Sequence, residues 1–163
     1  MRVRPASVED LPALLPLVRG YCEFYEADPP DEGLLEFCRA LTAAPDDQGM
    51  LLVAEDEAEG SGGEVVGFAA VSWKWSSLRA ARAAVMEDLF VAPHARSAGV
   101  ATSLIDACAE RAREHGAAAL EWLTAPDNDR AQRAYARAGG RSKPFLLYEL
   151  ALENRSNESQ RRR

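Results

Sequence analysis

The feature that most constrains the fold is a strand-to-helix junction in the second half of the chain. Residues 84–91 (AVMEDLFV) form a short apolar run, and Pro93 ends it. A long amphipathic helix is predicted over 99–116, closed by Gly116, with its apolar positions at Val100, Leu104, Ile105, Cys108 and Ala112. A strand that leads directly into such a helix is typical of an α/β domain, in which the helix covers one face of a sheet.

The rest of the chain supplies further strands and helices. Apolar runs predict strands at Val3 and over 49–56, 65–75, 118–125 and 144–152. Helical spacing and capping residues predict helices over 8–25, 31–45 and 127–140. The turn at 57–64 (EAEGSGGE) makes a hairpin of its two neighbours, and 76–84 (SSLRAARAA) fits either a short helix or a loop. This order predicts an α/β fold with a mixed, largely antiparallel sheet flanked by helices on both faces.

Composition supports one domain over 1–152, followed by a polar tail at 153–163 that we expect to be disordered. The three cysteines, Cys22, Cys38 and Cys108, are an odd number at no metal-like spacing, so we expect reduced thiols and no metal site. The longest apolar run near the start, 13–18, is too short to span a membrane. We therefore expect a cytoplasmic protein without membrane association.

The net charge of the chain indicates which kinds of molecule it can bind. Residues 1–152 carry 15 basic and 24 acidic side chains, a net charge of −9, which disfavours nucleic acid and attracts cations. Six acids fall within 23–36 without a base, at Glu23, Glu26, Asp28, Asp31, Glu32 and Glu36. This segment is either a lip that attracts a cationic substrate or a solvated acidic loop. Aromatic contacts to a cation are available from Tyr21, Tyr25, Trp73 or Trp75. We expect the strand to turn Trp73 and Trp75 to opposite faces, so that at most one faces the cleft.

The junction itself has the chemistry of an anion site. A helix N-terminus offers free N–H groups and a partial positive charge, and small residues let the backbone approach a phosphate. Gly99, Ala101, Ser97 and Ala98 are small, and Arg96 adds a charge-assisted contact. Short turns of this kind are common, so 96–101 is a weak signal by itself, and the GxxxxGK[ST] nucleotide loop is absent.

A second pattern lies in the following helix. Asn128, Ala131 and Tyr135 are spaced i, i+3 and i+7, so they share one helix face. An amide, a small residue and a phenol in a row fit a ligand that lies along that face. The alternative is a helix whose Tyr135 only packs on the core.

The two patterns together, V-x-P-x-x-R-x-x-G-V-A at 91–101 and N-x-x-A-x-x-x-Y-x-x-x-G at 128–139, resemble the GNAT superfamily of acetyl-coenzyme A (acetyl-CoA) dependent N-acetyltransferases. The resemblance implies that the backbone of Arg96, Ser97, Ala98, Gly99, Val100 and Ala101 holds the coenzyme pyrophosphate. It also implies that Leu89, Phe90 and Val91 pair with the pantetheine arm, helped by Asn128. Tyr135 would stand beside the thioester sulfur as general acid, and the enzyme would be a homodimer. Many family members have glycine where this chain has Ala101.

The acceptor is inferred from a weaker likeness. The segment VMEDLFV resembles the polyamine and diamine acetyltransferase branch, as do 21–36 and 65–76 more loosely. Since Glu87 and Asp88 alternate along a strand, only one is expected to face the site, and the resemblance favours Glu87 as general base. The alternative for Glu87 is a structural carboxylate bonded to a neighbouring strand or to Arg82. The substrate-binding set is predicted as Glu23, Tyr25, Glu26, Trp73, Trp75 and Glu87.

The sequence thus predicts direct acetyl transfer to a small cationic primary amine in a ternary complex. Two alternatives stay open. One is acetylation of a protein lysine, a protein N-terminus or an antibiotic amine. The other is a non-catalytic sensor of acyl-coenzyme A.

Overall fold

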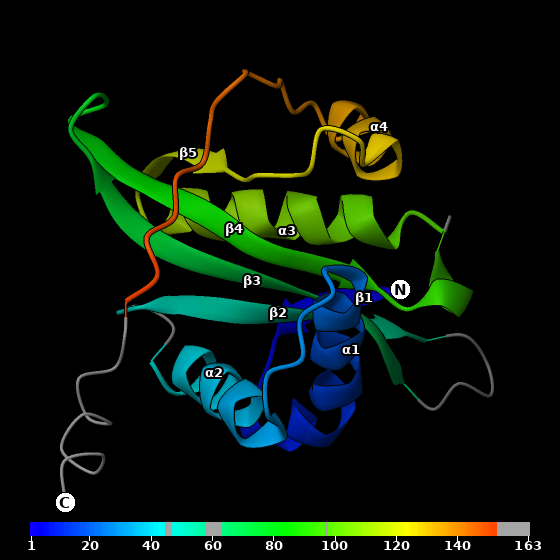
Figure 1. Ribbon diagram of the computed structural model, residues 1–163. Coiled ribbons are helices and arrows are strands. Elements are labelled where there is room, and N and C mark those ends of the chain that lie inside the picture. Colours follow the sequence, from blue (N-terminus) through cyan, green and yellow to red (C-terminus); the bar gives the residue numbers. More distant parts are fainter. Residues whose placement is uncertain (45–46, 58–62, 97, 153–163) are drawn as a thin grey trace, which may run out of the picture.

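The computed structural model describes residues 1–44, 47–57, 63–96 and 98–152 (Figure 1). The strands are β1 (Arg2–Pro5), β2 (Gly49–Asp56), β3 (Glu64–Ser76), β4 (Ala81–Val91) and β5 (Ala117–Glu121). The α-helices are α1 (Leu11–Phe24), α2 (Asp31–Ala43), α3 (Val100–Glu114) and α4 (Asp129–Arg137). Short 3₁₀ turns, η1 (Val8–Asp10) and η2 (Pro93–Ala95), precede α1 and α3.

The five strands form one sheet in the order β1-β2-β3-β4-β5. Neighbouring strands from β1 to β4 are antiparallel, and β5 runs parallel to β4 because α3 makes the crossover between them. Helices α1 and α2 lie on one side of the sheet, and α3 and α4 lie on the other (Figure 1). The predicted fold class, a mixed and largely antiparallel sheet with helices on both faces, is confirmed.

Each face of the sheet has its own apolar core. On one side, Leu14 and Val18 of α1 pack with Cys38 of α2 against Val53 and Phe68 of the sheet. On the other side, the five residues predicted to face the core from α3 are all buried, at Val100, Leu104, Ile105, Cys108 and Ala112. We refer to these as the α1 face and the α3 face of the sheet.

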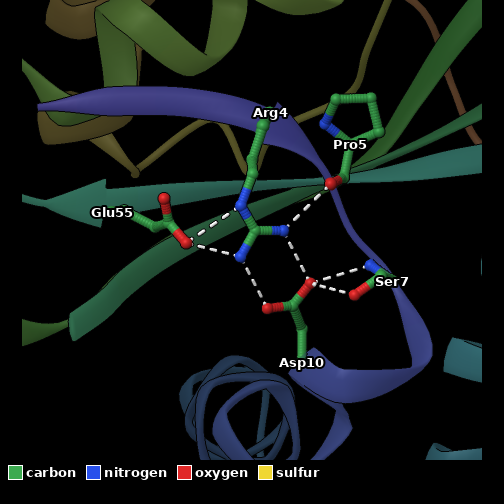
Figure 2. Close-up of polar contacts among 5 residues, drawn as sticks. All are labelled: Arg4, Pro5, Ser7, Asp10 and Glu55. Carbon is green, nitrogen blue, oxygen red and sulfur yellow. Dashed lines mark hydrogen bonds and ion pairs between the residues drawn. The ribbon is translucent and has the colours of Figure 1, made fainter. Parts of the chain in front are cut away.

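A buried carboxylate fixes the start of α1 to the sheet (Figure 2). Asp10 is 7% exposed, and both of its carboxylate oxygens accept hydrogen bonds from Arg4 of β1, at 2.7 and 2.8 Å. Arg4 also bonds Glu55 of β2, with its Nε at 2.9 Å, and the Ser7 backbone N–H donates to Asp10 at 2.7 Å. The hydrogen bonds from Arg4 lower the pKa of Asp10 to about 2. This network holds β1, β2 and the entry to α1 in one arrangement.

Three predicted segments differ in the structure. Residues 77–80 form a turn, so 76–84 contributes no helix and β4 begins already at Ala81. Strand β5 ends at Glu121 rather than at 125, and 144–152 forms no strand. The hairpin turn at 58–62 and the tail at 153–163 lie outside the described residues. Among the described ranges, no helix is both long enough and apolar enough to cross a membrane.

Candidate functional site

A β-bulge in β4 shapes the centre of the candidate site. Val71 of β3 pairs with Met86 and its neighbour Ala70 pairs with Asp88, so Glu87 has no residue opposite it. Met86 and Leu89 both pack on the α3 face, and two residues lie between them where a regular strand has one. The prediction that alternation sends only one of Glu87 and Asp88 to the site is therefore wrong, because the bulge interrupts the alternation.

The contacts of the two carboxylates place both on the α1 face. The Ser72 hydroxyl of β3 donates to Glu87 Oε1 at 2.5 Å, and Ser72 shares its face with Ala70 in the core under α1. Asp88 interacts with the phenol of Tyr21, which α1 contributes to the same core. Glu87 is exposed and Asp88 is half-buried. Glu87 thus has a bond to the neighbouring strand, one of the two structural contacts expected for it, whereas the other candidate partner, Arg82, bonds His115.

Asp88, which the sequence reasoning set aside in favour of Glu87, is a further candidate site residue. Burial raises the pKa of its carboxyl, the Tyr21 hydroxyl acts in the opposite direction, and the Glu87 charge raises it further. The exposed Glu87 carboxylate and the half-buried Asp88 carboxylate lie side by side and form a local centre of negative charge. Only knowledge of the bulge would have identified Asp88, because ED reads as one inward and one outward residue on a regular strand.

Three tyrosines lie near one another, and one of them contacts the bulge. The Tyr21 hydroxyl donates to the Glu87 backbone oxygen at 3.4 Å, and the Tyr21 and Tyr25 rings lie 5.1 Å apart. Burial raises the pKa of the Tyr135 phenol, and the nearby Tyr25 raises it further, so Tyr135 stays a proton donor at neutral pH. The Tyr135 ring contacts the Trp122 ring edge-on at 5.4 Å. Tyr21 thus contacts the backbone of the bulge and the Tyr25 ring, and Tyr135 of α4 interacts electrostatically with both tyrosines.

The backbone conformation at the start of α3 is suited to binding an anion. Gly99 caps the helix with φ +81°, and among the described residues other than its two chain neighbours no atom lies within 4 Å of the position a Cβ would take there. The left-handed conformation and the open space let the first-turn N–H groups of α3 face a ligand. Ala98, Val100 and Ala101 flank Gly99 as predicted, and Ser97 lies outside the described residues.

Two guanidinium groups lie near this helix start. Arg96 Nε donates to the Val91 backbone oxygen at 2.9 Å, and its guanidinium lies 5.5 Å from the centre of the Phe90 ring. Burial lowers the pKa of Arg96, and the positive charge of Arg130 lowers it further. Arg130 was not predicted, because an arginine in the first turn of a polar helix reads as a solvated side chain. Together the two cations favour an anion with more than one charge.

A free strand edge connects the helix start to the bulge. Strand β5 pairs with β4 only between Arg82 and Val85 of β4 and then ends at Glu121, while β4 continues to Val91. On that side, the backbone of Leu89, Phe90 and Val91 has no partner strand in the described part of the chain. Across from it, Asn128 caps α4, with Oδ1 accepting from the Ala131 N–H at 3.2 Å. Because Oδ1 of Asn128 is already bonded, its side-chain amide nitrogen is the group that can donate a hydrogen bond to a ligand. An open edge, a helix start and two arginines fit an extended ligand with a phosphate end.

The acidic lip is partly neutralised. Glu23 and Glu26 are exposed at the end of α1, as the lip prediction requires. Arg19, which precedes the acidic segment, forms ion pairs with Asp31 and, at 3.8 Å, with Asp28. The lip therefore has less net charge than its sequence alone indicates.

The two tryptophans lie away from the carboxylates. Trp73 stacks on His115 with ring centres 4.0 Å apart, and it packs on the α3 face. Trp75 is 74% exposed, and the Arg82 guanidinium lies 5.6 Å from its ring centre. The expectation of opposite faces is wrong, because residues two apart on a strand share a face. Both point to the face opposite Glu87 and lie toward the hairpin end, where Ser76 pairs with Ala81.

Comparisons with known proteins agree on one family. The sequence pattern of the acetyltransferase (GNAT) family matches residues 14–140. The uncharacterized N-acetyltransferase YhfO of Bacillus subtilis (strain 168) is 32% identical over 139 residues, which cover 85% of this chain and 89% of YhfO. A crystal structure of a probable acetyltransferase superposes with a TM-score of 0.80 at 29% identity, covering 94% of this chain and 99% of that one. The aminoglycoside N-acetyltransferase AAC(6')-Iy in complex with CoA shares the fold, with a TM-score of 0.77 at 21% identity over 92% of this chain and 93% of that one.

Proposed function

This chain belongs to the GNAT family of acetyltransferases, enzymes that use acetyl-CoA, and from that premise we propose that its acceptor is a small cationic primary amine. A polyamine, a diamine or a lysine-like amine has this chemistry. The observation that carries the proposal is the pair of carboxylates, Glu87 and Asp88, that the bulge turns to one face beside Tyr21 and Tyr25. A diamine or polyamine is charged at neutral pH, so a centre of negative charge with aromatic neighbours attracts it.

The coenzyme is proposed to lie along the free edge of β4. The N–H groups at the start of α3 would hold the pyrophosphate, with Gly99 giving access and Arg96 and Arg130 supplying positive charge. The backbone of 89–91 would pair with the pantetheine arm, and the Asn128 amide nitrogen would bond it from α4. When bound, acetyl-CoA supplies a thioester whose acetyl group an amine can attack. In this arrangement the reactive end of the coenzyme would lie toward the bulge and Tyr135.

The residues of this chain then have separate roles. An ammonium group has to lose a proton before its nitrogen can attack, and Glu87, exposed at the bulge, is proposed to accept that proton directly or through a water. Tyr135, whose phenol stays protonated, is proposed to donate a proton to the departing thiolate. Asp88 and Tyr21 would hold the charge of the acceptor next to Glu87. No covalent enzyme intermediate would be needed, because the two substrates are proposed to reach the bulge from different sides.

The acceptor is tested by measuring free-thiol release from acetyl-CoA with a panel of amines. The panel contains diamines, polyamines, lysine analogues, aminoglycosides, peptides, and neutral or acidic primary amines of similar size. We expect kcat/KM for the best cationic amine to exceed that for a size-matched neutral amine by about tenfold or more, which corresponds to ~1.4 kcal/mol of transition-state binding. Turnover restricted to neutral or acidic amines would overturn the cationic assignment, and coenzyme binding without turnover of any amine would favour a sensor.

A further inference from the structure

A buried hydroxyl group, that of Thr124, lies in the segment 122–128 that joins β5 to α4 (Figure 1). Its Oγ1 atom is shielded from solvent, and no group in the described ranges forms a hydrogen bond of normal geometry with it. A polar group buried in this way costs free energy, so its presence calls for an explanation. Valine has nearly the same shape and no polar atom, so packing alone does not explain a threonine at this position.

The Thr124 side chain points to the same side of the chain as Trp122. Leu123, which lies between them, is 69% exposed, whereas Trp122 and Thr124 are both partly buried. The Trp122 ring contacts the Tyr135 ring edge-on, and both rings pack against the core on the α3 face. Thr124 therefore faces the part of α4 that carries Tyr135.

The Thr124 hydroxyl acts on the phenol of Tyr135. Burial raises the pKa of Tyr135 and Tyr25 raises it further, while the Thr124 hydroxyl acts in the opposite direction. Tyr21 also interacts electrostatically with Tyr135. A donor lowers the pKa of a phenol when it stabilises the phenolate more than the neutral form. The Thr124 hydroxyl thus lies close enough to affect the Tyr135 oxygen without a hydrogen bond of normal geometry to it.

Polar contacts hold the segment around Thr124 to α4. Gln132 of α4 donates from its side-chain amide to the Pro126 backbone oxygen at 2.8 Å and to the Ala125 backbone oxygen at 3.5 Å. The Asn128 backbone N–H also donates to the Ala125 backbone oxygen, at 3.1 Å. These bonds fix the segment relative to α4, so the Thr124 hydroxyl keeps its place beside the helix.

We propose that Thr124 is a positioning residue for acetyl transfer, whose hydroxyl donates a hydrogen bond to the Tyr135 oxygen when that oxygen gives up its proton. This inference rests on the role of general acid proposed above for Tyr135. As the amine displaces the thiolate, the carbon–sulfur bond breaks with its electron pair on sulfur, and the Tyr135 proton passes to the sulfur. The Tyr135 oxygen then carries a negative charge until water returns a proton to it. Thr124 keeps its own proton throughout, and its hydrogen bond to the charged oxygen is stronger than one to a neutral phenol.

The variant Thr124→Val should separate stability from activity. Valine keeps the shape and removes a buried hydroxyl, so the thermal unfolding temperature should stay the same or rise. With acetyl-CoA and the best acceptor of the amine panel, kcat should nevertheless fall about tenfold, the scale of one hydrogen bond to a charged group, while the KM for acetyl-CoA changes little. Thr124→Ser keeps the hydroxyl and should keep most of the activity. Thr42→Val on α2 removes a hydroxyl that donates to the Cys38 backbone oxygen at 2.9 Å, and this matched control should leave kcat unchanged.

A double-mutant cycle with Tyr135→Phe shows whether Thr124 acts through the phenol. Once the phenol oxygen is removed, Thr124→Val should not lower kcat any further. A further loss of about tenfold in the double variant would overturn the inference, because Thr124 would then act elsewhere. An unchanged kcat for Thr124→Val, or a Thr124→Ser variant as slow as Thr124→Val, would also overturn it while Tyr135→Phe alone still tests the general acid. Full activity of Tyr135→Phe would overturn both roles.

Titration of the Tyr135 phenol gives a second readout, which needs neither coenzyme nor acceptor. Protein that is isotopically labelled at the tyrosine Cζ carbon gives an NMR signal that moves when the phenol loses its proton, and Tyr135→Phe assigns that signal. The pKa of Tyr135 should be higher in Thr124→Val than in wild type, because the hydrogen bond that favours the phenolate is lost. Equal pKa values for Tyr135 in the two proteins would show that the Thr124 hydroxyl does not bond the Tyr135 oxygen, and would overturn the inference.

Discussion

Glu87 and Asp88 are neighbours in the chain, yet both side chains lie on the α1 face of the sheet, because Glu87 is the extra residue of a β-bulge. The bulge therefore does two things at one point of β4. It gathers two carboxylates that are proposed to attract a cationic acceptor, and it lies just before the free edge at 89–91 that is proposed to hold the coenzyme. The following predictions test each part of this arrangement.

Neutralising Glu87 and neutralising Asp88 should change different kinetic constants. Glu87→Gln should lower kcat for a diamine by about 10², the usual scale of lost general-base catalysis, with a small change in KM. Asp88→Asn should instead raise KM for the diamine by about tenfold, because a half-buried charge next to the acceptor is lost. Asp106→Asn, on exposed α3 surface, removes the same charge far from the site and is the control. An equal rise in KM from Asp106→Asn would show that only overall charge matters.

Tyr135 should act through its hydroxyl group. Tyr135→Phe should lower kcat by at least about tenfold while the KM for the coenzyme changes little, since the ring still packs on Trp122. Because the pKa of Tyr135 is raised by burial, its phenol should remain a donor throughout the neutral and mildly alkaline range. Tyr148→Phe removes a hydroxyl from the exposed segment that follows α4 and should leave kcat unchanged. Full activity of Tyr135→Phe would remove Tyr135 from the chemistry.

Coenzyme binding should depend on the backbone at Gly99. Gly99→Ala forces a left-handed conformation on a residue with a Cβ and places that Cβ in the open space before α3, so the KM for acetyl-CoA should rise about tenfold or more. Gly116→Ala is a matched control, because Gly116 has φ +77° and equally open surroundings at the other end of the helix. Both variants should lose similar thermal stability. Equal KM values for acetyl-CoA in the two variants would contradict an anion site at Gly99.

The Arg4–Asp10 network should set the acid limit of stability. The pKa of Asp10 is lowered to about 2, so its contribution is complete above pH ~4, the ordinary pKa of an aspartate, and is lost as pH falls toward 2. Asp10→Asn should reduce the free energy of unfolding at pH 7 by ~2 kcal/mol, and the difference from wild type should shrink at pH 2–3. Urea unfolding at both pH values measures this. If the difference in the free energy of unfolding between wild type and Asp10→Asn did not change with pH, the charge of Asp10 would not contribute to stability.

The sequence predicted best what depends on a repeated pattern. Leu104, Ile105 and Cys108 recur at helical spacing, and that spacing alone predicts which face of α3 is buried. The bulge at Glu87 was missed because one extra residue changes neither composition nor apolar content. The pairing of Arg19 with Asp31 joins different helices, so no local pattern reveals it. The apolar run at 144–152 reads as a strand but forms none in the structure, because an apolar run alone does not specify the strand edge with which it would pair.

The most direct test of the central claim is acetyl transfer by a chain from which Glu87 is deleted. The deletion restores regular alternation, because Met86 and Leu89 are then separated by Asp88 alone and keep the α3 face. We predict a folded protein that still binds acetyl-CoA but transfers its acetyl group to a diamine at least about 100-fold more slowly than wild type. Thermal unfolding and coenzyme binding are measured on the same sample. Transfer within about threefold of wild type would show that the bulge does not bring the two substrates together.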